Sequence, residues 1–286
     1  MTADAHLPPV TIVRACLRDG TGGSPTAVLD DGPLSDSERR RVPVLAGTSH
    51  AVFVSTPGGD GAATALLRFF TAEGELPACG HGTVAALAHL AERSGADTYR
   101  TTLRTANRTF TGWAARDTTG LRAAFDPGPV DLRDPTGMEY DLVLPALGIT
   151  ARTLAPGARI ASVGRPRLLL PLASPAAVTA LAPDFDRLRA ACDRLGLLGC
   201  YAYSEPTARG RVTARMFAPS IGVPEDIANA NSTACLAAHL ADRGITDLTV
   251  DMGDSLGSPA TITATARQGP TGPVIRLGGA AQVLRR

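Results

Sequence analysis

Short apolar runs bounded by turn residues predict the first strands of this chain. Three of these runs place strands at Val10–Leu17, Ala51–Val54 and Thr64–Phe70. A Gly-Gly-Ser-Pro turn is expected at residues 22–25. Ser35 and Glu38 have the spacing of a capping box, which predicts a helix that continues to about Val44.

Two later segments are apolar on every side of a helix. Between Val84 and Ala91 every residue except His89 is apolar, and most are alanine. The segment Ala234–Ala241 has the same character, interrupted by His239. A helix that is apolar all round is buried, and its small side chains predict that strands pack closely around it. We interpret the two histidines as core residues.

The remaining pattern completes an α+β fold in which mixed strands surround one central helix per lobe. Helices are expected at about Tyr140–Leu147 and 184–195, and the Pro- and Gly-rich residues 126–137 are interpreted as a connection between lobes. Further strands are predicted at Thr101–Thr105, Thr109–Ala114, Leu121–Phe125, Arg159–Val163, Arg167–Leu172, 199–203, 211–217, 248–252, 260–266, 273–277 and 280–284.

The chain contains an internal repeat whose copies start at Glu75 and Glu225. Both copies have threonine eight residues later, and both end in a similar run, His-Leu-Ala-Glu-Arg in one and His-Leu-Ala-Asp-Arg in the other. They differ at two reactive positions, where the first copy has Cys79 and His81 and the second has Asn229 and Asn231. This divergence predicts an active site in a cleft between two pseudo-symmetric lobes, residues 1–130 and 131–286.

Composition excludes several classes of function. The net charge is +1 without a basic run, so nucleic acid and anionic membranes are not expected partners. The N-terminal Met1–His6 lacks the pattern of a secretory leader, and the five scattered cysteines suggest neither disulfides nor a zinc site. We therefore expect a cytoplasmic protein without a bound metal. The chain has no lysine, which excludes a Schiff base and a covalently held pyridoxal phosphate.

Each copy of the repeat places its divergent residues at the start of a buried helix. Helix N-termini present unpaired N–H groups and a partial positive charge, which favour an anion. Two such ends across a lobe interface could bind a substrate carboxylate. A cysteine at a helix N-terminus, such as Cys79, tends toward a lowered pKa and could act as an acid or base.

Several segments together resemble the PhzF-like (phenazine-biosynthesis isomerase) family. These are Gly22–Val28, Thr48–Val54, Arg68–Ala72, Gly74–His81, Arg215–Asp226 and Gly278–Ala280. The resemblance covers nearly the whole chain. It implies the fold of diaminopimelate epimerase, with two pseudo-symmetric lobes that are each a strand barrel around a central helix. It also implies cofactor-free proton transfer on small cyclic amino or carboxylic acids, and a homodimer.

The chain departs from the family pattern at positions that matter for chemistry. The family's catalytic glutamate, in a Ser-Glu pair, corresponds to His50 after Ser49, and Ser24 replaces the asparagine of Gly-Gly-Asn-Pro. Histidine has an unperturbed pKa near 6.5 and can serve as a general base. We expect His50 to be the proton shuttle, assisted by Cys79 and Asp226 as further catalytic residues. The expected substrate-binding residues are Ser24, Gly80, His81, Gly82, Thr83, Asn229, Ala230 and Asn231.

The hypotheses differ in reaction. A racemase with two bases is disfavoured, because Asn229 stands where related epimerases keep their second cysteine and cannot titrate. The main hypothesis is an isomerase that shifts a double bond in a small carboxylate-bearing ring, within an antibiotic pathway. An epimerase-related dehydratase or lyase with Cys79 as its single base is one alternative. A catalytically silent relative that binds a ligand is the other.

Overall fold

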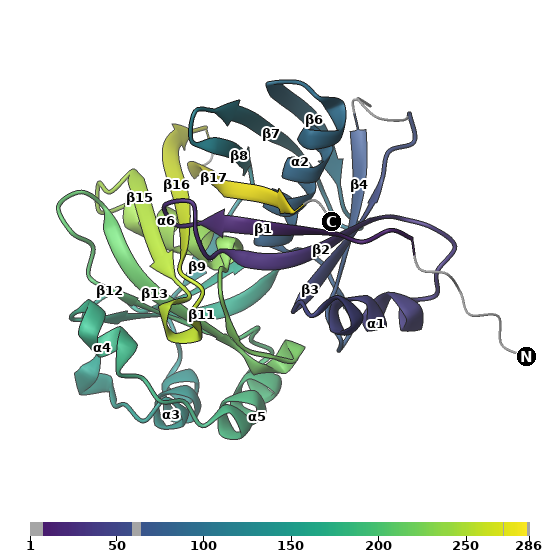
Figure 1. Cartoon of the computed structure of the whole chain (residues 1–286). Helices are drawn as coiled ribbons and strands as arrows, with labels where there is room; N and C mark the ends of the chain where they lie inside the picture. Colours follow the sequence, from purple (N-terminus) through teal and green to yellow (C-terminus); the bar gives the residue numbers. More distant parts are fainter. Residues whose placement is uncertain (1–7, 59–63, 271, 285–286) are drawn as a thin grey trace, which may run out of the picture.

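The computed structural model describes residues 8–58, 64–270 and 272–284 (Figure 1). The segment Met1–His6, on which the absence of a leader was argued, lies outside them. In the first half, the helices are α1 (Asp36–Ala46), α2 (Gly80–Ser94) and α3 (Gly137–Ala146). The strands are β1 (Thr11–Leu17), β2 (Ser24–Asp30), β3 (His50–Ser55), β4 (Thr64–Phe70), β5 (Glu75–Leu76), β6 (Thr98–Arg104), β7 (Thr109–Asp117), β8 (Gly120–Phe125) and β9 (Asp131–Arg133).

The second half has helices α4 (Pro175–Thr179), α5 (Phe185–Leu195) and α6 (Ala230–Ala241). Its strands are β10 (Arg159–Val163), β11 (Arg165–Leu172), β12 (Cys200–Ser204), β13 (Arg211–Ala218), β14 (Val223–Asp226), β15 (Asp247–Met252), β16 (Ala260–Gly269) and β17 (Gly272–Leu284). No helix among the described residues is both long and apolar enough to cross a membrane.

Local signals explain why several of these elements start and end where they do. Both members of the predicted capping box are present at α1, where Ser35 Oγ accepts from Glu38 N and the Glu38 carboxylate accepts from Ser35 N. Gly47 then ends the helix with a left-handed backbone at φ 66°. An equivalent box, formed by Thr136 and Glu139, starts α3.

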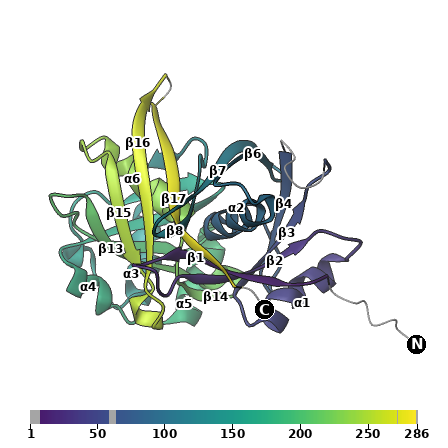
Figure 2. The same ribbon diagram turned by 45° about the horizontal axis from the view of Figure 1, so that its top comes forward.

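The two alanine-rich helices are buried among strands, as predicted. Helix α2 contacts strands β1 to β4, β6 to β8 and β17, and Figure 2 shows it enclosed by them. Helix α6 contacts β9, β10 and β15 to β17 in the same way. His239 is buried within α6, in agreement with the expected core role, whereas His89 of α2 is only partly buried. The mixed α+β arrangement with one central helix per lobe is confirmed.

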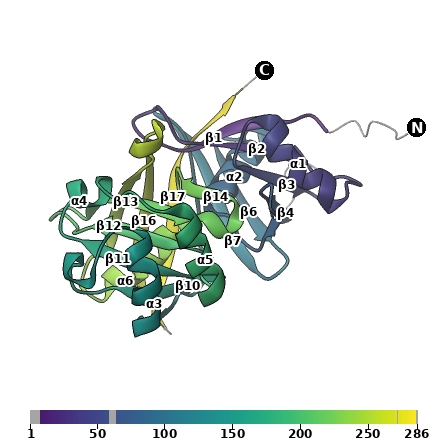
Figure 3. The same cartoon turned by 90° about the horizontal axis from the view of Figure 1, so that it is seen from below.

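The remaining helices lie outside the strands. Helices α3, α4 and α5 gather on one outer face of the second half, as Figure 3 shows from below. They share an apolar core with strands β10 to β13. Helix α1 packs against the outer side of β2, β3 and β4 in the first half.

The prediction of two strands at 273–277 and 280–284 is wrong, because one continuous strand, β17, spans both. Its glycines allow close approach instead of a turn. A Cβ on Gly279 would lie 3.1 Å from Cys16 Cα, and one on Gly278 would lie 2.8 Å from the Ala123 carbonyl oxygen. Strand β17 pairs in turn with β16, β8 and β1. It thereby joins strands of both halves, and the division at residues 130 and 131 stays a prediction.

Other differences concern local structure. The turn expected at 22–25 is made by Gly22 and Gly23 alone, which both have positive φ, and Ser24 already begins β2. The rest of β2, strands β5, β9 and β14, and helix α4 were not predicted, and β9 lies within residues 126–137, which were interpreted as a connection. The sequences of β14 and α4 are only four and five residues long, too short to show a period.

Candidate active site

The first residues of α2 form one side of the site. Cys79 is the N-cap residue, and its side chain makes no capping hydrogen bond. Its Sγ instead lies 3.6 Å from Nε2 of His81. The absence of a side chain on Gly82 makes room for this arrangement, because a Cβ there would lie 3.0 Å from the same sulfur.

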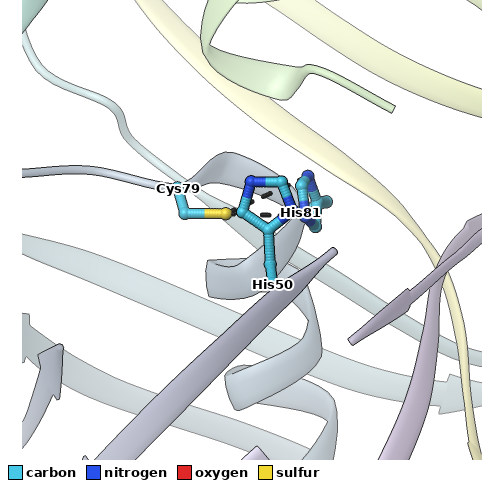
Figure 4. A group of neighbouring side chains, drawn as sticks. All are labelled: His50, Cys79 and His81. Atoms are coloured by element: carbon cyan, nitrogen blue, oxygen red, sulfur yellow. Dashed lines mark hydrogen bonds between the residues drawn. The ribbon is translucent and has the colours of Figure 1, made fainter. Parts of the chain in front are cut away.

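His50, at the start of β3, completes a compact group with Cys79 and His81 (Figure 4). The two imidazole rings meet edge to face, with centroids 4.4 Å apart and an interplanar angle of 85°. Nδ1 of His50 lies 2.9 Å from Ser49 Oγ, which leaves Nε2 available for chemistry. Both histidines are only 2% exposed. The structure thus brings together three residues that the sequence analysis selected.

The second copy of the repeat supplies the partners of His81. Nδ1 of His81 donates to the carbonyl oxygen of Ala228 at 2.7 Å, which directs Nε2 toward Cys79. The Asp226 carboxylate lies 3.9 Å from the same Nδ1 and accepts a hydrogen bond from Asn229 Nδ2 at 2.9 Å. The ring of His81, which belongs to the first copy of the repeat, is therefore oriented by residues of the second copy.

The environment separates the pKa values of the two histidines. Burial, reinforced by the charge of His81, lowers the pKa of His50 well below its usual 6.5. Burial also opposes a charged His81, but the neighbouring Cys79 and Asp226 outweigh it and raise the pKa of His81 to about 10. Burial raises the pKa of the Asp226 carboxyl. At neutral pH, the site therefore combines the neutral imidazole of His50 with the imidazolium of His81. Two neighbouring groups with displaced pKa values are typical of sites in which one acts as the base and the other as the acid.

The N-termini of α2 and α6 meet at this site. A Cβ on Gly80 would lie 2.5 Å from the Ala230 side chain and 3.0 Å from the backbone nitrogen of Asn231. Asn229 is the N-cap residue of α6, and its Oδ1 accepts from Ser232 N at 2.9 Å. Since its Nδ2 donates to Asp226, the Asn229 amide is engaged on both sides.

A small cavity of about 40 Å³ lies against the group. It is lined by seven of the predicted site residues: His50, Cys79, Gly80, His81, Asp226, Asn229 and Asn231. Ser24, Gly82, Thr83 and Ala230 are buried in the fold but do not line it. Three larger cavities, of about 590, 530 and 330 Å³, are lined by none of the predicted site residues. The chemistry therefore points to the small cavity.

The sequence analysis missed two arginines in the cavity wall, Arg165 and Arg167 of β11. A signal for them exists in the sequence. Arg167 opens the apolar run that forms β11, and charged residues are rarely buried in a strand unless they have a partner.

The same group offers donor atoms that a metal could use. One ligand atom each from His50, Cys79 and His81 lies within 4.8 Å of the others. Imidazole and thiolate are donors that zinc prefers. Proton transfer and metal binding would compete for these atoms, so a chelator distinguishes the two uses.

Comparison with known proteins agrees with the geometry. A family model described as phenazine biosynthesis-like protein (PhzC-PhzF) matches residues 16–286. The trans-2,3-dihydro-3-hydroxyanthranilate isomerase of Pseudomonas chlororaphis is 32% identical over 253 residues, which cover 86% of this chain and 85% of that protein.

Two solved structures share the fold. A PhzF-family phenazine biosynthesis protein of Bacillus anthracis superposes with a TM-score of 0.82 at 17% identity, over 96% of both chains. A hydroxyproline epimerase of Agrobacterium vitis superposes with a TM-score of 0.64 at 10% identity, over 96% of this chain and 90% of that one. The fold is thus that of the diaminopimelate epimerase type. The chain belongs to the phenazine biosynthesis-like (PhzC-PhzF) family, and it is an isomerase of that family.

Proposed function

We propose that this isomerase shifts a double bond by cofactor-independent proton transfer in a small cyclic amino or carboxylic acid. The reaction would belong to secondary-metabolite (antibiotic) biosynthesis and take place in the cleft between lobes 1–130 and 131–286. The observation that carries the proposal is the pair of histidines, His50 and His81, whose pKa values are displaced in opposite directions within one buried group. A homodimer and a cytoplasmic location stay predictions.

The proposed reaction uses His50 first as the base and then, as the imidazolium, as the acid that gives a proton back. Nε2 of His50 removes a proton from one ring carbon, and the electrons of that C–H bond form the new double bond. The electrons of the old double bond then take up a proton at its far carbon, so the product is an isomer of the substrate. The imidazolium of His81 stabilises the negative charge that develops between the two steps.

Solvent deuterium tests this reaction in the unaltered protein. The probe is trans-2,3-dihydro-3-hydroxyanthranilate, the compound named for the P. chlororaphis relative. In D₂O, we expect part of the product to carry one deuterium and part to retain the hydrogen of the substrate. The reason is that His50 is only 2% exposed, so exchange with solvent competes with return to the ring.

Dialysis against EDTA is the control for the metal donors, and the proposal expects an unchanged rate. An activity that EDTA abolishes and Zn²⁺ restores would assign His50, Cys79 and His81 to a metal instead. Absence of both product and deuterium incorporation, with this probe and with related ring carboxylates, would remove the support for proton transfer.

The pH dependence follows from the two displaced pKa values. We expect kcat/KM to rise with pH on an acid limb that lies well below pH 6.5, as His50 loses its proton and becomes a base. It should fall through about pH 10, where His81 loses the proton that makes it an imidazolium. The measurement is kcat/KM from pH 4 to 11. The variant His81→Gln should lose the alkaline limb, and an alkaline limb that persists in it contradicts this assignment.

A second candidate reaction is favoured by one contact. Cys79 Sγ lies 3.6 Å from His81 Nε2, close enough for a hydrogen bond between a reactive cysteine and a histidine. In a dehydratase or lyase, Cys79 would remove the proton and the substrate would lose water. The two reactions differ in the composition of the product and in which variant abolishes them.

A further inference from the structure

Arg167 is a buried arginine without an acidic partner. It lies on β11, is 1% exposed and lines the cavity beside the two histidines. Nη2 donates to the Arg165 carbonyl oxygen at 2.6 Å, and Nη1 donates to Ser232 Oγ at 3.3 Å. Nε is buried and has no protein partner. No Asp or Glu among the described residues forms an ion pair with this guanidinium.

Arg39 shows how this fold treats another buried arginine. It is 6% exposed, and its Nη2 lies 2.7 Å from Asp31 Oδ1. A buried charge is stable when an opposite charge and hydrogen bonds replace the water it has lost. Arg39 has that compensation within the chain. Arg167 has hydrogen bonds from two of its nitrogens but no ion pair, so an anion that enters the cavity can supply its counter-charge.

Two acceptors in the same cavity are also unsatisfied. Asp226 Oδ1 and Asn231 Oδ1 are buried, and neither has a protein hydrogen-bond partner. They come from the end of β14 and from the first turn of α6. The cavity therefore contains an uncompensated cationic donor together with two free acceptors. The ligand that satisfies all of them has an anion next to a hydrogen-bond donor.

We propose that Arg167 is the anion anchor of this site. It binds the carboxylate of the substrate, while Asp226 and Asn231 accept hydrogen bonds from an amino or hydroxyl group on the neighbouring carbon. This assignment rests on the proposed function for the identity of the cavity. At about 40 Å³, the cavity holds little more than a water molecule, so its walls must separate to admit a ring.

Binding measurements test the anchor without turnover. The probe is 3-hydroxyanthranilate, a planar ring with a carboxylate, an amine and a hydroxyl, and its partner probe is 2-aminophenol, which lacks only the carboxylate. By calorimetry, Arg167→Gln is expected to bind 3-hydroxyanthranilate about ten- to a hundredfold more weakly than the unaltered protein. Its affinity for 2-aminophenol should be unchanged. Arg167→Lys, which keeps the charge, should recover part of the loss.

Thermal unfolding separates an anchor from a structural arginine. Without ligand, Arg167→Gln is expected to keep or raise the Tm, because it removes an uncompensated buried charge. The matched control Arg39→Gln should lower the Tm, since it leaves Asp31 without its partner, and it should leave the affinity for 3-hydroxyanthranilate unchanged.

Three outcomes overturn the proposal. Arg167→Gln and the unaltered protein could bind 3-hydroxyanthranilate with equal affinity, or Arg167→Gln could lose affinity for both probes equally and show a lowered Tm. The third is that the unaltered protein binds neither probe. The anchor and the isomerase reaction can fail separately. Selective loss of the carboxylate probe in Arg167→Gln, with no deuterium incorporation by the unaltered protein, supports the anchor and rejects the reaction. If Arg167→Gln still incorporates deuterium at an unchanged KM, the result supports the reaction and rejects the anchor.

Discussion

The substitution His50→Gln is expected to lower kcat by about 10²- to 10⁴-fold, the usual contribution of a general base. Glutamine is close to histidine in size and can still form hydrogen bonds, but it cannot accept a proton near neutral pH. His50 is well suited to the base role because burial keeps its imidazole neutral and Ser49 Oγ fixes its ring. The measurement is kcat together with deuterium incorporation into trans-2,3-dihydro-3-hydroxyanthranilate in D₂O.

The matched variant is Cys79→Ser, which changes the second reactive group of the same cluster. If His50 is the shuttle, Cys79→Ser should retain most of the activity and all of the single-deuterium incorporation. The reverse result, in which Cys79→Ser abolishes activity and His50→Gln leaves most of it, would support the dehydratase or lyase. Binding of the ring carboxylates without exchange, in the unaltered protein and in both variants, would match a silent ligand-binding relative.

The substitution Gly80→Ala is expected to destabilise the protein by at least about 1–3 kcal/mol and to impair catalysis. The added Cβ would lie 2.5 Å from the Ala230 side chain and 3.0 Å from Asn231 N, so α2 and α6 must move apart where they meet. That movement shifts Cys79 and His81 away from Asp226. The free energy of unfolding in urea and kcat/KM are the two measurements.

Gly137→Ala is the control for Gly80→Ala. Gly137 is also the first residue of a helix, and nothing lies within 4 Å of the Cβ that would be added. Alanine is favoured over glycine in a helix by roughly 0.5–1 kcal/mol, so this variant should be equal to or more stable than the unaltered protein. If Gly80→Ala has the same free energy of unfolding and the same kcat/KM as Gly137→Ala, the close contact between the ends of α2 and α6 does not constrain the site.

Much of the secondary structure could be predicted because its causes are local. The capping box at Ser35 and Glu38 needs only neighbouring residues to form, and an apolar run such as Thr64–Phe70 shows its preference for a strand in the local sequence. The burial of α2 was also predictable, because a helix without a polar face has no side to offer to water. The single strand β17 was not, since Gly278 and Gly279 are indistinguishable from turn glycines until Cys16 and Ala123 are known to pack against them.

The candidate site could be predicted in part. The repeat selected Cys79 and His81, and the family resemblance selected His50; the structure places these three together. Arg167 was missed because its sequence neighbourhood is an ordinary apolar strand. Its place at the start of an apolar run is a weak signal, and its burial and lack of an acidic partner, which distinguish it from the many surface arginines of a lysine-free chain, come from the structure.

The sequence by itself determined the α+β class, the two buried helices and the divergence of the repeat, because propensity, capping and periodicity act over a few residues. The tertiary structure decided which groups share one cavity and how their protonation is biased. A pKa depends on burial and on charges a few ångströms away, and these come from segments far apart in the chain: β3, the start of α2, and the end of β14. The opposed pKa shifts of His50 and His81 are therefore a property of the fold.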